Sequence, residues 1–139
     1  MADDWFTRYP GLEFTRHPEG VLLITIDRPA AMNATDAALH RALSRIWTDV
    51  DDDSDTRVVV ITGKGKAFSA GGDLAWIETM VGNYAGMQAA FREAGDIVYG
   101  MTRCTKIIIS AINGVAVGAG LAVALMADIS LMAEEAKIT

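Results

Sequence analysis

Residues 107–126 read IIISAINGVAVGAGLAVALM and contain no charged side chain. A membrane-spanning helix needs about twenty apolar residues, so the length alone suits one. Ser110, Asn113 and several glycines interrupt the stretch, however, and glycine weakens a helix and favours a break. Asp128 follows closely, and no basic cluster lies on one side to orient a span. The stretch therefore favours a buried strand, a glycine loop and a buried helix in series.

The rest of the chain alternates between strand and helix patterns, which is typical of a layered α/β fold. Continuous apolar, β-branched runs predict strands over residues 21–27, 57–62, 107–112 and 129–133. The run 57–62 is of the kind that a parallel sheet buries on both faces. Apolar residues spaced by three or four predict helices over residues 34–50 and 84–103. A third helix is predicted to begin at or near Asp73, and a fourth is predicted over residues 120–129.

The predicted helix over residues 34–50 has one apolar stripe and one polar face. Thr35 and Asn33 are both candidate caps for its start, because their side-chain oxygens accept hydrogen bonds from N–H groups. His40 falls on the polar face, so we expect it, like His17, to be a surface residue.

The composition is that of a globular protein of 139 residues, with 51% hydrophobic and 22% charged residues. A net charge of −6 gives no support for a nucleic-acid partner. Cys104 is the only cysteine and cannot form an internal disulfide, so we expect it to pack as a small, buried hydrophobic residue. The start MADDWFTRYP lacks the features of a signal peptide, which makes a cytoplasmic protein the expectation.

An aspartate run resembles the beginning of a calcium-binding loop. Asp51, Asp53 and Asp55 alternate as the first ligands of such a loop do. Thr56 stands where that loop needs glycine, and Thr62 stands where it needs glutamate. We therefore predict a solvated loop and no metal site.

Two glycine-rich segments each follow a predicted strand and lead into a predicted helix. They are KAFSAGGDL (66–74) and NGVAVGAGLA (113–122). TGKGKAFS (62–69) lacks the G-x4-G-K-[ST] order of a P-loop, and the second segment lacks the third glycine of the dinucleotide-binding fingerprint. Helix starts present unpaired N–H groups, and two such groups aimed at one point make an oxyanion hole. From the residues alone, the alternative stays open that these glycines serve only tight strand-to-helix turns.

The order of motifs resembles the enoyl-CoA hydratase/isomerase family, or crotonases. The motifs are RPAAMNA (28–34), VVVITGKGKAFSAGGDL (58–74) and IIISAINGVAVGAGLAVALMADI (107–129), and the resemblance runs from about residue 20 to the end. It implies stacked ββα turns, an acyl-CoA thioester substrate in fatty acid metabolism, no cofactor beyond the coenzyme A of that substrate, and a homotrimer or hexamer. Because the family domain is about twice as long, residues 1–139 are expected to form its N-terminal half, which needs the C-terminal half to complete the site.

The resemblance also implies roles for individual residues. Gly72 and Ala119 would supply the two oxyanion N–H groups. The positions that would line the coenzyme A and acyl site are Arg28, Ala31, Met32, Ala70, Asp73, Leu74 and Gly118. The acyl pocket would contain Trp76, Ile77, Met80 and Ala122.

One expected group is missing. Ala122 stands where the hydratases have their first catalytic glutamate, and the second would lie beyond Thr139. Asp73, Glu78 and Asp128 are the nearest local carboxylates, and each also suits a cap or a surface position. Two hypotheses follow: an acyl-CoA isomerase, hydrolase or decarboxylase with its acid elsewhere, or a non-catalytic acyl-CoA-binding protein or assembly subunit.

Overall fold

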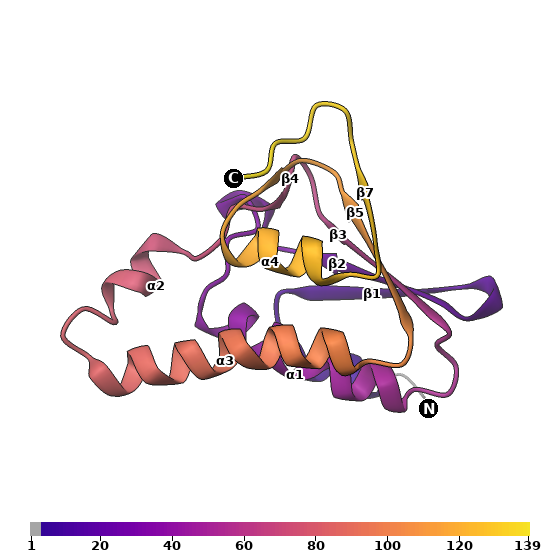
Figure 1. Cartoon of the computed structure of the whole chain (residues 1–139), viewed down its shortest axis with the longest axis horizontal. Helices are drawn as coiled ribbons and strands as arrows, with labels where there is room; N and C mark the ends of the chain where they lie inside the picture. The colour runs from indigo at the N-terminus through magenta and orange to yellow at the C-terminus, as the bar shows by residue number, and fades with distance from the viewer. Residues whose placement is uncertain (1–3) are drawn as a thin grey trace.

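The computed structural model describes residues 4–139, which form an α/β structure with a five-stranded sheet (Figure 1). The strand order of this sheet is β1-β2-β3-β5-β7; β1 is antiparallel to β2, and all other pairs are parallel. Its strands are β1 Leu12–His17, β2 Val21–Ile26, β3 Val58–Gly63, β5 Ile107–Ile112 and β7 Ile129–Met132. A second, small parallel sheet contains β4 Ala67–Ser69 and β6 Val115–Ala116. The helices are α1 Ala37–Asp52, α2 Leu74–Glu78, α3 Tyr84–Arg103 and α4 Ala119–Met126.

Each predicted strand and helix is present, with small shifts at the ends. The helix predicted over 84–103 has those bounds, whereas α4 begins one residue earlier than predicted and ends at Met126. Strands β1, β4 and β6 are not among the predicted elements. The last two are too short to leave a pattern, and β1 is an edge strand that mixes polar and apolar residues.

The large sheet is covered by helices on one face, and this corrects the expectation of burial on both. In β3, Val59 and Ile61 are fully buried, whereas Val58 and Val60 are only half-buried. Strand β2 has the same alternation. Side chains of successive strand residues point to opposite faces, so only one set faces the helices and the core.

Helix α1 is capped by Asp36, not by Thr35 or Asn33. The Asp36 carboxylate accepts from the Leu39 N–H at 2.9 Å. Thr35 instead forms a parallel β-bridge with Gly72 of the first glycine loop. Asn33 is fully buried, and its Nδ2 donates to the carbonyl oxygens of Lys64 and Ala67. Both rejected candidates are therefore occupied by long-range contacts that local sequence does not reveal.

Helix α3 lies beside α1 along one side of the molecule, and only its second half is buried (Figure 1). Ile97 and Met101 face the core. Tyr84 and Phe91, which belong to the predicted apolar stripe, are 74% and 72% exposed. The first half of α3, together with α2, projects beyond the sheet, so no described element covers these side chains (Figure 1).

The aspartate run is not a solvated loop, because its first residues end α1 and Asp53 is buried. Asp53 Oδ2 accepts from Arg16 Nη1 at 2.9 Å and from Thr56 Oγ1 at 2.5 Å. Burial alone would raise the pKa of Asp53, but the hydrogen bonds from Arg16 and Thr56 hold that pKa below its ordinary value. This residue fastens the end of α1 to β1.

The uncharged stretch 107–126 is divided among β5, β6 and α4. Within residues 4–139 no helix has both the length and the apolar character needed to cross a bilayer. The helix α4 is only partly buried, since Leu125 is exposed. His17 is exposed, as expected.

Candidate functional site

The small sheet joins the two glycine loops. Because the carboxyl ends of paired parallel strands lie side by side, the loops that follow β4 and β6 also meet. The Val117 N–H donates to the Ser69 carbonyl at 3.0 Å. Gly71 has a φ of +88°, and a Cβ there would lie 2.7 Å from the Val117 carbonyl oxygen. Only glycine allows this approach of one loop to the other.

The backbone N–H groups of Gly72 and Ala119 have no acceptor within residues 4–139. Thr35 pairs with the neighbours of Gly72: its N–H donates to the Gly71 carbonyl, and its carbonyl accepts from the Asp73 N–H. The Gly72 N–H therefore points away from the Thr35 segment. Ala119 is the first residue of α4, where helix N–H groups have no partner within the helix.

Both residues line one cavity of about 370 Å³. Its wall is formed by Thr35, His40, Gly72, Trp76, Ile77, Met80, Val81, Met87, Ala90, Phe91, Ala94 and Ala119. The structure thus brings the two predicted oxyanion residues together with three of the predicted acyl-pocket residues. Ala122 is not in this wall, because α4 meets the cavity only at its first residue and Ala122 lies one turn beyond it.

His40 is buried in the cavity wall, which corrects its expected place on the surface. Its exposed fraction is 5%, and its Nδ1 lies 2.8 Å from Glu93 Oε2 on α3. The imidazole ring packs against Trp76 with ring centroids 4.9 Å apart. The sequence holds a signal for this burial, since His40 precedes Leu43 and Trp47 by three and seven positions and so shares their side of the helix.

Arg28 is held within the protein. Its guanidinium lies 3.4 Å from the carboxylates of both Asp36 and Asp73, and Nη1 also donates to the Ala34 carbonyl. Asp73 in turn caps α2, as predicted, by accepting from the N–H groups of Ala75 and Trp76. Arg28 therefore bridges the residues that cap α1 and α2 and positions the first glycine loop.

The other residues predicted to contact coenzyme A do not line this cavity. Met32 and Leu74 are exposed, and the Ala70 N–H donates to the Met32 carbonyl at 3.0 Å. Ala31 ends the short helix Pro29–Ala31, and Gly118 is exposed at the start of α4.

The three local carboxylates lie outside the described cavity wall. Asp73 pairs with Arg28, and Glu78 is exposed. Asp128 Oδ2 accepts from the Ile108 N–H at 2.8 Å and so joins β5 to the end of α4. Among the described residues, the titratable side chain in this wall is His40.

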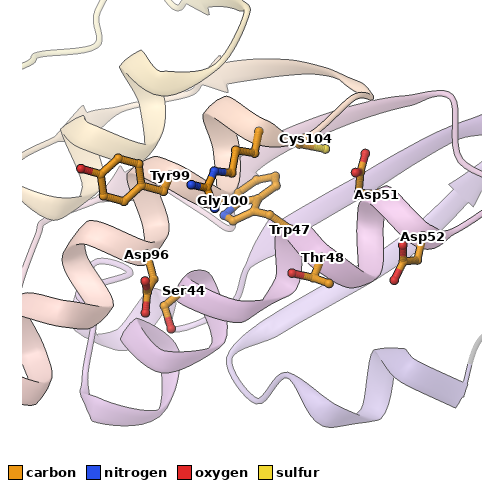
Figure 2. A pocket seen from close by; sticks show the side chains of 10 residues that line it. Ser44, Trp47, Thr48, Asp51, Asp52, Asp96, Tyr99, Gly100 and Cys104 are labelled. Carbon is orange, nitrogen blue, oxygen red and sulfur yellow. The ribbon is translucent and has the colours of Figure 1, made fainter.

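A second cavity of about 310 Å³ lies between α1 and α3 and is polar (Figure 2). Its wall contains Trp47, Asp51, Asp52, Asp96, Arg103 and Cys104, among others. Cys104 is half-buried, and burial raises the pKa of its thiol. Asp51 accepts from the N–H and hydroxyl of Thr105. Because several aspartates line this second cavity, it offers little apolar surface for an acyl chain. It differs in this respect from the cavity lined by Gly72 and Ala119, called the glycine-loop cavity below.

A family model described as Enoyl-CoA hydratase/isomerase matches residues 16–139. The chain belongs to the enoyl-CoA hydratase/isomerase family. Curated relatives include the mevalonyl-coenzyme A hydratase of Beauveria bassiana, 36% identical over 84% of this chain and 44% of the relative. The (E)-benzylidenesuccinyl-CoA hydratase of Thauera aromatica is 37% identical over 91% of this chain and 47% of its own length. The chain thus spans about half the length of these relatives.

Solved structures of the family confirm the fold. An enoyl-CoA hydratase/isomerase from Mycobacterium paratuberculosis superposes with a TM-score of 0.87 at 35% identity, covering 92% of this chain and 51% of that one. An enoyl-CoA hydratase from Bacillus anthracis gives a TM-score of 0.85 at 30% identity, covering 92% and 49%. The crotonase-type fold predicted from the two glycine loops is therefore present in this chain.

Proposed function

We propose that this chain carries the carbonyl-binding part of an acyl-CoA enzyme, with an oxyanion hole formed by the N–H groups of Gly72 and Ala119. The supporting observation is that both groups lack an acceptor and belong to the wall of one largely apolar cavity. A thioester carbonyl oxygen gains negative charge when Cα loses a proton or when a nucleophile adds at Cβ of an enoyl thioester, and the resulting enolate loses that charge when Cα is protonated. Two preorganised N–H donors stabilise that charge, and losing one typically costs ~3–4 kcal/mol.

The apolar wall is proposed to hold the acyl chain, with Trp76, Ile77 and Met80 as contacts. Coenzyme A would enter as part of the substrate, with no other cofactor, along the loops that contain Ala31, Met32, Ala70, Leu74 and Gly118. The relatives named for mevalonyl-coenzyme A and benzylidenesuccinyl-CoA support a thioester substrate. Arg28 and Asp73 would shape this path through their ion pair rather than by contacting phosphate.

The proposed reaction is that of a lyase or isomerase acting through an enolate, not classical hydration. Ala122 cannot transfer a proton, and the local carboxylates lie outside the described cavity wall. We therefore favour an isomerase, hydrolase or decarboxylase whose acid lies at a position unlike that of the hydratases. We place the protein in the cytoplasm and in fatty acid metabolism, as a homotrimer or hexamer whose site is completed by the C-terminal half of the fold.

Replacing Ala119 tests the oxyanion hole directly. Ala119→Pro removes one N–H at the first helical position, where proline is tolerated, and Ala119→Gly retains it. The readout is the infrared carbonyl stretch of ¹³C-labelled butyryl-CoA bound to the protein. We expect a shift to lower frequency in the wild type and in Ala119→Gly, and a smaller shift in Ala119→Pro. An unshifted carbonyl in the wild type would contradict the proposal.

A second candidate function is acyl-CoA binding without catalysis, and Ala122 is the observation that favours it. Turnover separates the two candidates. Crotonyl-CoA hydration is expected to be slow or absent in both, so the panel must include isomerisation, hydrolysis and decarboxylation of acyl-CoA thioesters. Carbonyl polarisation with no turnover of any thioester supports the binding protein, whereas rapid crotonyl-CoA hydration overturns the role assigned to Ala122.

A further inference from the structure

His40 is the unusual residue of the glycine-loop cavity. The other side chains of the wall are apolar, apart from the indole N–H of Trp76 and the hydroxyl of Thr35, which donates to the Gly71 carbonyl at 3.2 Å. Nδ1 of His40 is hydrogen-bonded to the Glu93 carboxylate, but Nε2 has no hydrogen-bond partner within residues 4–139. His40 as a residue is only 5% exposed, but its Nε2 atom is not itself fully buried, so this nitrogen remains accessible to a ligand in the cavity.

The orientation of the ring is fixed from two sides. Glu93 accepts through Oε2 from His40 and through Oε1 from Arg41 Nε at 3.1 Å, so its carboxylate is held between two residues of α1. Trp76 packs against the ring at an interplanar angle of 49°. Because a carboxylate only accepts hydrogen bonds, the Nδ1 position carries the proton and Nε2 is left for a ligand.

We propose that the acyl group of the natural substrate carries an oxygen substituent, a hydroxyl or a carboxylate, which His40 Nε2 binds inside the acyl pocket. A neutral ring accepts at Nε2 from a hydroxyl, and a protonated ring donates to a carboxylate. A site built to hydrogen-bond such a group selects strongly against the analogue that lacks it. This specificity role rests on the proposed acyl-CoA function and makes His40 a binding residue that Glu93 positions.

Acyl-CoA ligands that differ only at the chain end test the idea. Calorimetry on the protein would measure dissociation constants for thioesters of four and six carbons that end in a methyl, a hydroxymethyl or a carboxylate group. We expect one of the two oxygen-bearing ends to bind about tenfold more tightly than the methyl end at one chain length. Which end is preferred identifies the substituent, and equal or tighter binding of the methyl end at both lengths overturns the proposal.

Three substitutions assign the preference to Nε2. His40→Gln retains a hydrogen-bonding atom near the Nε2 position and should keep the preference. His40→Asn retains only the atom near Nδ1, and His40→Leu retains neither, so both should lose it. A preference that survives His40→Leu would overturn the role of His40 while leaving acyl-CoA binding intact. Failure of all the thioesters to bind the wild type would instead contradict the proposed function itself.

Discussion

Gly120 is required where the two glycine loops approach each other. A Cβ at this position would lie 2.5 Å from both the Cβ and the carbonyl oxygen of Ser69, at the end of β4. Ser69 is fully buried and cannot move without displacing the loop that carries Gly72. Gly95 is different, because a Cβ there would lie 3.9 Å from Tyr99 Cε2, which is an ordinary van der Waals distance.

We therefore expect opposite effects from two glycine-to-alanine changes. Gly120→Ala should lower the free energy of unfolding by about 1–3 kcal/mol, since overpacking forces the backbone apart. Gly95→Ala, within α3, should raise it by up to about 1 kcal/mol, because alanine favours the helix. Urea denaturation of both variants measures the difference, and equal effects would contradict the close approach of the loops.

At the scale of elements, Asp53 joins the end of α1 to β1. Arg16 reaches it from β1, and Thr56 reaches it from the turn before β3. Both contacts favour the ionised carboxylate, so the folded-state pKa lies below the unfolded value. This contribution to stability is complete above the unfolded pKa and is lost as the pH falls through the folded pKa.

Asp53→Asn should accordingly lower the free energy of unfolding by about 2 kcal/mol at neutral pH. The difference from the wild type should stay constant down to about pH 5 and shrink below about pH 4, where the Asp53 carboxylate of the unfolded wild type begins to take up a proton. Denaturation curves at several pH values provide the measurement. Asp52→Asn is the matched control, since Asp52 is exposed, and a loss that does not change with pH would argue against the ion pair.

At the scale of the whole molecule, β7 leaves one edge of the large sheet open and apolar. Leu131 is 60% exposed, and Ile129 and Met132 are exposed beside it. An uncovered edge strand with such side chains pairs readily with another chain.

The isolated chain should therefore self-associate or dissolve poorly. Leu131→Glu should reduce association, because a charged residue opposes edge pairing. Thr15→Glu introduces the same charge in β1, at the opposite edge, and should have little effect. Analytical ultracentrifugation over a range of concentrations compares the variants. A wild type that is monomeric at all concentrations and melts cooperatively would contradict this expectation.

Local patterns predicted most elements because each depends on neighbouring residues. The continuous apolar runs predicted β2, β3 and β5, and the three- and four-residue spacing of apolar side chains over residues 84–103 predicted α3. The order of the two glycine loops predicted the family. The predictions for the cap of α1 and for His40 are wrong, because Thr35 and Asn33 are engaged by residues far along the chain and His40 pairs with Glu93 of α3.

The sequence by itself determined the elements, the family and the residues whose N–H groups are candidates for an oxyanion hole. Only the tertiary structure decided that Gly72 and Ala119 share one cavity, that Ala122 lies outside its wall and that His40 lies within it. The physical reason is that the pairing of β4 with β6 and the packing of α3 on α1 are long-range contacts. Periodicity encodes which face of an element is apolar, but not which distant segment comes to cover it.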